Sequence, residues 1–252
     1  MSPVLRDLYG LNTGGAFGVF LLLNTGIVAG SALLCVVIAR TFRRHRLFDR
    51  WEPFKPIEMA AVVVTVVLNA LVSVAGWALW KHDVIHLVSR PWWGVIRDTV
   101  LMVAVMDLGM YVLHRVAHLR WIYRLFHFFH HRHEVTNPLS LFVLHPLEVI
   151  GFGSMMIGFL CVHAMDPVAL TAYLGLNVLF GTLGHCGVEP FPDCLRKIPL
   201  LRLVGTSTFH AEHHERPGYN FGFYTLVWDQ LFGTLDPDYW SRYQKAAEER
   251  TI

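Results

Sequence analysis

The sequence predicts an all-α, polytopic membrane protein with four to five apolar helices and a cytosolic helical cap. Its 252 residues are 54% hydrophobic and 16% charged, with a mean hydropathy of +0.43; a soluble domain has about 25% charged residues. Residues 8–39 and 59–80 contain no Asp, Glu, Lys or Arg. Both runs exceed the roughly 20 apolar residues that cross a bilayer. The remaining observation is that Lys and Arg gather in alternate loops, as they do in membrane proteins.

Five apolar segments follow one another along the chain, at about 17–39, 57–80, 95–113, 149–165 and 167–184. The loop between the second and third contains Trp92 and Trp93, which suit the aromatic belt at a membrane surface. Asp166 and Pro167 form a turn signal, so the last two segments are expected to make a hairpin. The first segment is too long for the apolar part of a signal peptide, and we expect it to stay attached.

The basic residues predict which loops share a side of the membrane. If the arginine-rich stretch 40–55 is cytosolic, alternate crossings also put 114–146 and 185–252 in the cytosol. These three stretches hold 6, 4 and 7 of the 21 Lys and Arg residues. We therefore expect an integral, multi-pass protein of the bacterial inner membrane or endoplasmic reticulum, with its histidine motifs on the cytosolic side.

A single domain, 1–252, accounts for this organisation. Residues 1–94 supply the N-terminal membrane segments, 95–236 a histidine-rich region and 237–252 a C-terminal tail. The four cysteines include no CxxC pair and no disulfide-framework spacing. Cys35 and Cys161 lie inside apolar runs, where cysteine usually serves as a small buried side chain.

Three short motifs concentrate the chemistry: "HRVAH" (114–118), "HFFHH" (127–131) and "HAEHH" (210–214). On a helix, residues three and four apart share a face. Each motif therefore predicts a helical face of imidazoles, and Asp107 and Tyr111 lie on the same stripe as His114 and His118. The motifs offer eight nitrogen ligands, more than the roughly four to six that one metal ion takes, so eight suit two ions.

The ligand type leaves the metal open, because imidazole suits Zn, Cu, Fe and Ni. A structural zinc site needs only four ligands. The carboxylate-rich pattern of soluble di-iron bundles does not account for this set. The zinc-protease motif His-Glu-x-x-His is also absent, since His133-Glu134 is followed by "VTNP".

The three motifs, in this order after a membrane helix, resemble the histidine boxes of the fatty acid hydroxylase/sterol desaturase superfamily. The flanking stretches "DLGMYVLHR", "NPLSLFVLHPLE", "LGHCGVEPF" and "YNFGFYTLVWDQLFGTL" are similar to that family's connecting signatures. The resemblance covers roughly residues 100–236. It implies a membrane-bound, O₂-dependent non-haem di-iron oxidoreductase that hydroxylates or desaturates a sterol-like or fatty acyl lipid.

By motif match, the resemblance implies ligand roles for the box histidines: His114, His118, His127, His130, His131, His210, His213 and His214. His145 in "HPLE" and His185 in "LGHCGVE" match further family histidines and are expected as additional ligands. For His133, a surface position and a supporting role near the metals both stay open. The implied cofactors are two iron ions, Fe²⁺ or Fe³⁺, with O₂ as co-substrate.

Asp107 and Tyr111 are the candidate catalytic residues. An ionisable side chain inside a span is costly unless it is partnered, and we expect Asp107 to accept a histidine N–H, with Tyr111 as the intermediary. A hydrogen bond that only packs helices is the alternative. Glu148, near His145, is a similar candidate, and Asp229 is expected to anchor structure beneath the site.

The resemblance also implies the partners: the membrane, a lipid substrate, and a separate electron carrier of cytochrome or ferredoxin type with its reductase. The fused-carrier signature His-Pro-Gly-Gly is absent from the chain, and no nucleic-acid partner is expected. The rival class is a membrane metal-ion transporter or metal-binding protein without oxygenase chemistry. Transporters place their ligands near the bilayer midplane, whereas these histidines lie at helix ends on one side.

Overall fold

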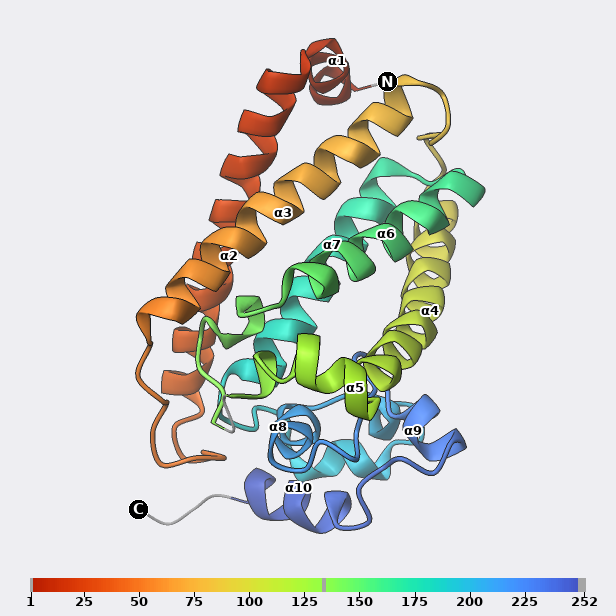
Figure 1. The fold of residues 1–252 in the computed structure, drawn as a ribbon. Helices are drawn as coiled ribbons and strands as arrows, with labels where there is room; N and C mark the ends of the chain where they lie inside the picture. Colours follow the sequence, from red (N-terminus) through yellow and green to blue (C-terminus); the bar gives the residue numbers. More distant parts are fainter. Residues whose placement is uncertain (1, 133–134, 249–252) are drawn as a thin grey trace.

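The computed structural model describes residues 2–132 and 135–248, and these residues form helices joined by turns and loops (Figure 1). The α-helices are α1 (Pro3–Gly10), α2 (Thr13–Thr41), α3 (Pro56–Lys81), α4 (Trp92–Ala117), α5 (Arg120–Ile122), α6 (Pro146–Val162), α7 (Pro167–His185), α8 (Ser207–Glu215), α9 (Val227–Leu231) and α10 (Tyr239–Ala247). The remaining elements are the π-helix η1 (Tyr123–His127) and the 3₁₀-helices η2 (His130–Arg132), η3 (Ser140–Phe142), η4 (Asp193–Lys197) and η5 (Leu201–Leu203).

Four of these helices, α2, α3, α4 and α7, are long and apolar enough to cross a membrane. At 1.5 Å per residue, the 26 residues of α3 and α4 extend about 39 Å, beyond the roughly 30 Å of a bilayer's hydrocarbon core. The apolar α6 is shorter, with 17 residues. The predicted all-α architecture of four to five apolar helices is therefore confirmed.

Local signals in the sequence fix where these helices begin. The Asn12 side chain accepts from Gly15 N at 2.8 Å and caps α2, and Asp166 accepts from Val168 N at 2.7 Å and caps α7. Pro146 and Pro167 follow the caps of α6 and α7, in the first helical turn, where proline's fixed φ suits a helix and its missing N–H costs nothing. The turn expected at Asp166 and Pro167 is thus the start of α7.

The α5–η3 segment and α8–α10 form a cap over one end of the membrane helices (Figure 1). The cap has its own buried core, in which Phe209 of α8 and Leu226 pack against Tyr239 and Tyr243 of α10. A separate core, with Met102, Met106 and Tyr173 among its members, lies between α4, α6 and α7. The cap therefore holds α8 beside the ends of α4 and α7.

One local prediction was wrong. "HFFHH" does not form a regular helical face: His127 ends the π-helix η1, a turn follows, and His130 and His131 lie in the 3₁₀-helix η2. His127 and His131 join one group of histidines and His130 joins another. Single π turns of this kind are frequent at functional sites.

Candidate metal centre

Nine histidines meet under the cap in two groups, and within each group the candidate ligand atoms all lie within 4.8 Å of one another. The first cluster joins the end of α4 to the second and third motifs: His114, His118, His127, His131 and His213. The second cluster joins the end of α7 to the same two motifs: His130, His185, His210 and His214. All eight box histidines therefore enter a cluster, and so does His185.

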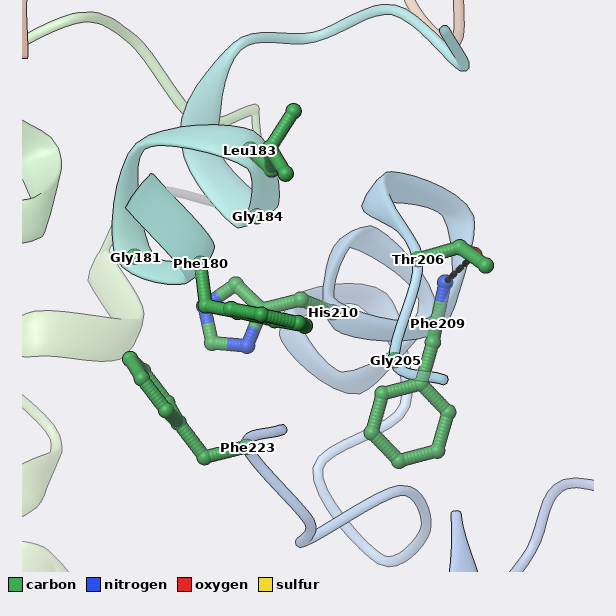
Figure 2. A pocket seen from close by; sticks show the side chains of 9 residues that line it. All are labelled: Phe180, Gly181, Leu183, Gly184, Gly205, Thr206, Phe209, His210 and Phe223. Atoms are coloured by element: carbon green, nitrogen blue, oxygen red, sulfur yellow. Dashed lines mark hydrogen bonds between the residues drawn. The ribbon is translucent and has the colours of Figure 1, made fainter. Parts of the chain in front are cut away.

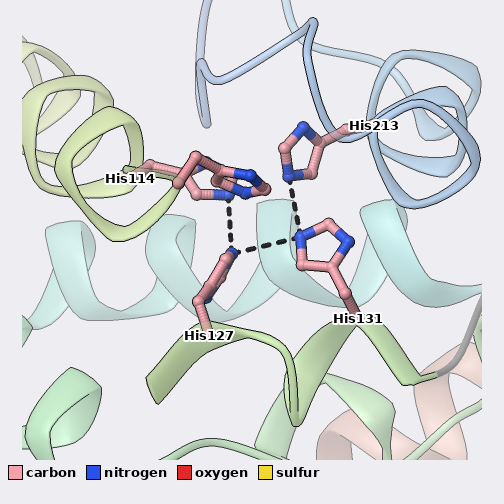
Figure 3. Close-up of side chains that lie close together, drawn as sticks. His114, His127, His131 and His213 are labelled. Carbon is pink, nitrogen blue, oxygen red and sulfur yellow. Dashed lines mark hydrogen bonds between the residues drawn. The ribbon is translucent and has the colours of Figure 1, made fainter. Parts of the chain in front are cut away.

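Ring nitrogens face one another at short distances in the first cluster (Figure 3). The Nε2 atom of His127 lies 3.2 Å from that of His114 and 3.1 Å from that of His131. The Nε2 atoms of His131 and His213 are 3.0 Å apart. In the second cluster, Nε2 of His210 lies 3.0 Å from that of His185 and 3.2 Å from that of His214.

The second and third motifs each contribute histidines to both clusters, in opposite proportions. His127 and His131, four residues apart, enter the first cluster, and His130 enters the second. The third motif does the opposite, because His210 and His214 enter the second cluster and His213 the first. Each of these two motifs therefore supplies ligands to both clusters, so the two clusters depend on the same two segments of the chain.

Hydrogen bonds at Nδ1 determine which nitrogen is exposed to the first cluster. His114 Nδ1 lies 2.9 Å from the Phe221 carbonyl, and His213 Nδ1 lies 2.6 Å from the Tyr219 carbonyl. Since a carbonyl only accepts, we assign the ring hydrogen of both to Nδ1. His127 Nδ1 likewise contacts the Glu148 carboxylate. These three rings therefore present a bare Nε2 lone pair to the cluster.

The second cluster follows the same rule. His130 Nδ1 lies 3.2 Å from the Val143 carbonyl, and His185 Nδ1 lies 2.7 Å from Ser140 Oγ. Ser140 already donates its only hydrogen to the Asn137 carbonyl at 2.8 Å, so it must accept from His185. His130 and His185 are therefore also hydrogenated at Nδ1.

This arrangement fits a pair of divalent cations. His114 and His127 both carry their ring hydrogen at Nδ1, so no hydrogen bridges their Nε2 atoms, which lie 3.2 Å apart. Two bare lone pairs at this distance repel one another unless something positive lies between them. In addition, His118 Nε2 and His131 Nδ1 are buried without a hydrogen-bond partner among the described residues. Histidine ligands in metalloproteins typically donate their second nitrogen to a carbonyl or carboxylate, as four of these rings do, and His185 donates to the Ser140 hydroxyl instead.

Burial keeps the cap histidines in the neutral form that binds metal. It lowers the pKa of His127 and His130 to about 4, in His130 with a further contribution from His127. The pKa values of His118, His131 and His213 are lowered by burial and by neighbouring imidazoles. Because ligand nitrogens must be deprotonated, these rings are ready for a cation at neutral pH.

Two buried carboxylates brace the elements that present the ligands. Asp229 accepts from the backbone N–H groups of Phe221 and Gly222, at 2.8 and 2.7 Å, and so holds the loop whose carbonyls contact His114 and His213. Glu189 accepts from Thr208 N and Oγ1, at 2.9 and 2.7 Å, at the start of α8. Burial raises the pKa of both carboxyl groups.

The structure does not place Asp107 and Tyr111 against the histidine rings. Asp107 accepts from Tyr224 N at 3.1 Å and from Trp228 Nε1 at 3.0 Å, as well as from Thr225. The Tyr111 hydroxyl lies 3.0 Å from Thr234 Oγ1. Asp107 thus ties α4 to the loop between α8 and α9 and to α9 itself, and Tyr111 ties it to the residues after α9. For Asp107 this is the packing alternative.

His145 and His133 also differ from the remaining candidates. His145 is outside both clusters; its Nδ1 accepts from Leu147 N at 3.2 Å and its ring lies against Phe126, so it caps α6. His133 lies outside the described residues. Glu148 contacts His127 Nδ1 through one oxygen and accepts from His145 N at 2.8 Å through the other.

A cavity of about 280 Å³ leads from the clusters into the membrane helices. His114 and His127 of the first cluster line one end, with His130, His185 and His210 of the second. The walls are mostly apolar side chains of α2, α3, α4, α6 and α7. Two lining residues, Ile27 and Leu174, are 39% and 38% exposed, so the cavity wall includes side chains at the lipid-facing surface.

Close packing behind His210 fixes one side of the second cluster (Figure 2). A Cβ atom on Gly184 of α7 would lie only 3.0–3.2 Å from three carbon atoms of His210. Phe180 and Phe223 lie near the same ring (Figure 2). Glycine at position 184 therefore allows α7 and α8 to approach closely enough for His185 and His210 to share a site.

Sequence reasoning missed the groups that orient the rings and the polar side chains that α2 and α3 contribute to the cavity wall. Ser140 and Asn137 lie in "NPLS", a stretch whose polar residues between two apolar segments were a usable signal. The backbone carbonyls of Tyr219, Phe221 and Val143 gave no signal in the sequence, because every residue has a backbone carbonyl. Thr65 and Asn69 were visible as polar residues inside an uncharged run.

Comparisons with known proteins agree with this geometry. The sequence model of the family described as "Fatty acid hydroxylase" matches residues 99–234, more than half of the chain. The very-long-chain aldehyde decarbonylase GL1-6 of Oryza sativa is 29% identical over 99% of this chain and 39% of its own length. No solved structure matches the chain.

Two further relatives are similar over a shorter stretch. The very-long-chain aldehyde decarbonylase GL1-1 of Oryza sativa is 32% identical over 62% of this chain and 27% of its own length. The very-long-chain aldehyde decarbonylase CER1 of Arabidopsis thaliana is 28% identical over 63% of this chain and 27% of its own length. The chain thus spans 39% or less of the length of these relatives.

Proposed function

Since the chain belongs to the fatty acid hydroxylase family, we propose that it is a membrane-bound, O₂-dependent non-haem di-iron oxidoreductase that oxidises a lipid. The observation that carries this proposal is the pair of histidine clusters, whose Nε2 atoms converge in two groups at the end of an apolar cavity. Two iron ions held by these histidines would supply the oxidising chemistry that, with O₂ and two supplied electrons, breaks an unactivated C–H bond, which acid–base side chains cannot break.

The protein's own residues would bind and align the lipid. The apolar walls of α2, α3, α4, α6 and α7 would hold an alkyl chain with one end at the clusters and exclude water from the reacting carbon. A lipid could enter from the bilayer past Ile27 and Leu174, which belong to both the cavity wall and the lipid-facing surface. The histidines would stay neutral and serve as ligands.

We also propose that the clusters face the cytosol, as the distribution of Lys and Arg predicts. There a separate carrier of cytochrome or ferredoxin type, reduced by its own reductase, would supply the electrons. The exposed Arg120, Arg124 and Arg132, in and beside η1 and η2, offer positive charge to an acidic carrier close to the first cluster.

A second candidate reaction is the conversion of a very-long-chain aldehyde. It is favoured by the names of the relatives, one of which matches 99% of this chain. The two candidates differ in product. Lipid mass spectrometry of cells with and without the gene should show a hydroxylated or desaturated lipid for the first, and loss of a long-chain aldehyde with gain of a shorter hydrocarbon for the second.

His213→Ala tests the proposal, because it removes from the first cluster the ligand supplied by the third motif. We expect the reductase-coupled, lipid-dependent consumption of O₂ to fall to background and the bound iron to fall below about two per chain. His86→Ala is the control, because His86 is exposed in the loop before α4. Undiminished turnover in His213→Ala would contradict the ligand assignment.

A further inference from the structure

The cavity wall carries a band of neutral polar side chains away from the histidines. On α3, Thr65, Asn69 and Ser73 line the cavity at intervals of four residues, and Asn24 of α2 and Asn177 of α7 line it as well. Residues four apart share a helical face. Polar groups inside a membrane span are costly without a partner, and they commonly mark a substrate pathway.

Thr65 gives the strongest sign that this band awaits a ligand. Its side chain is 1% exposed, and its Oγ1 has no hydrogen-bond partner among the described residues. Serine and threonine in membrane helices usually donate to the carbonyl four residues earlier, as Thr25, Ser73, Thr99, Thr171 and Thr182 do here. The Thr65 hydroxyl departs from that pattern in the wall of the cavity.

The asparagines add both donors and acceptors. Asn177 Oδ1 accepts from the Tyr224 hydroxyl at 2.7 Å, which leaves the Asn177 amide N–H groups for the cavity. Asn24 Nδ2 donates to the Phe20 carbonyl at 2.8 Å, which leaves its Oδ1 to accept. Of the described lining residues, Glu148 alone is formally charged, and it lies at the histidine end. This band therefore suits a hydroxyl or carbonyl rather than a carboxylate, phosphate or ammonium group.

Helix geometry gives the distance from the clusters. Asn177 precedes His185 on α7 by eight residues, or about 12 Å. Val62 packs against Val143, whose carbonyl contacts His130, and Asn69 lies seven residues, about 10 Å, farther along α3. An extended chain advances roughly 3.3–3.6 Å for every three covalent bonds. By the same measure Thr65, three residues from Val62, lies only about 5 Å along α3, so the band runs from about four bonds at Thr65 to about nine bonds at Asn69 and Asn177. An oxygen about six bonds from a carbon held at the clusters therefore lies between Thr65 and Asn69.

We propose that the band formed by Asn24, Thr65, Asn69, Ser73 and Asn177 binds a neutral oxygen group of the lipid, a hydroxyl or carbonyl, between Thr65 and Asn69 and so about six bonds from the carbon that reacts. This inference rests on the proposed function, because it names the substrate class of the same cavity. The substrate is then a long-chain lipid with a second oxygen function inside the chain, and Thr65 is a specificity-determining residue.

The test compares two probes that differ only at the seventh carbon, six bonds from the first. Octadecane-1,7-diol and octadecan-1-ol compete with tritiated octadecane-1,7-diol for the purified full chain in detergent, with and without anaerobically added Fe²⁺. We expect the diol to bind about five- to tenfold more tightly, the effect of a hydrogen bond to an otherwise unpaired group. Thr65→Val and Asn69→Leu should reduce the preference to about one, and Thr65→Ser should retain it.

Thr171→Val is the matched control, because Thr171 is exposed on α7 and donates to the Pro167 carbonyl; it should keep the diol preference. Equal affinity of the wild type for both probes, or an unchanged preference in Thr65→Val, would overturn the inference. The two probes share the terminal hydroxyl, so their ratio is independent of what binds at the clusters. A diol preference without O₂ consumption would refute only the proposed function, and O₂ consumption without the preference would refute only this inference.

Discussion

The partners of the Nδ1 atoms decide which nitrogen each histidine leaves for a metal ion. In His114, His130 and His213 the partner is a backbone carbonyl, in His127 the Glu148 carboxylate, and in His185 the Ser140 hydroxyl. In the assigned arrangement, each of these five partners accepts a hydrogen bond from the Nδ1–H group of its histidine. The site is therefore specified as much by these acceptors as by the imidazoles.

Asp229→Asn tests the acceptors without touching a ligand. The two carboxylate oxygens of Asp229 accept from the N–H groups of Phe221 and Gly222. In asparagine one of these oxygens is replaced by an NH₂ group, whose hydrogens would face the hydrogen of one backbone N–H and repel it. The Phe221 carbonyl would then shift away from His114. We expect roughly ten- to hundredfold weaker iron binding, the usual effect of losing an outer partner, measured as bound iron at a buffered Fe²⁺ concentration. Asp49→Asn, at an exposed position, should bind iron as the wild type does, and a wild-type affinity in Asp229→Asn would refute the role of the loop.

The residues themselves were largely predictable from the sequence, but their orientation was not. The eight box histidines could be identified because their spacing is local, and His185 because its surrounding signature resembles that of the family. His145 matched a signature equally well, yet it caps α6 instead. The acceptors for His114 and His213 lie in a loop whose position depends on Asp229 and Asp107, so a pattern in the sequence does not locate them.

At the scale of elements, the two clusters depend on how closely α7 and α8 approach. His185 ends α7 and three further ligands lie on α8, so a small change in their separation alters the second cluster. The sequence predicted α8 as a histidine-bearing helix. It did not predict the π and 3₁₀ turns of the second motif, because packing around His127, His130 and His131 selects them over a regular helix.

Gly184→Ala tests this approach. The added Cβ would lie 3.0–3.2 Å from the His210 side chain, so the ring must move by a few tenths of an ångström. We expect a fall in iron content and a several-fold loss of turnover. Gly175→Ala, on the same helix with no atom within 4 Å of the added Cβ, should leave both unchanged and stabilise α7 by about 0.5–1 kcal/mol. Equal behaviour of the two variants in iron content and turnover would contradict close packing at Gly184.

For the whole molecule, hydropathy and charge predicted the membrane helices and the position of the cap. They could not predict the cavity, because an internal space depends on how side chains from five helices pack together. The polar residues of α3 were visible in the sequence, yet only the fold shows that they line the same space as Asn177 and the histidines. The lipid class that we propose therefore rests on the fold and not on the sequence pattern.

Acid should destabilise the metal-free protein. The pKa of His127 and His130 is about 4 in the folded protein, against an ordinary value of about 6.5. Both rings are neutral in either state above pH 6.5, and below it the unfolded chain takes up protons first. Stability is therefore lost as the pH falls from about 6.5 to about 4. A melting temperature of the metal-free protein that stays constant across this range would contradict the burial of neutral imidazoles.

The central claim is that two iron ions lie in separate sets of imidazole ligands at the end of one cavity. X-ray diffraction at the iron absorption edge, from crystals of the full chain loaded anaerobically with Fe²⁺, locates the ions directly. We predict two anomalous peaks per chain, one among His114, His118, His127, His131 and His213 and the other among His130, His185, His210 and His214. A single peak, or iron bound elsewhere with both clusters empty, would contradict it.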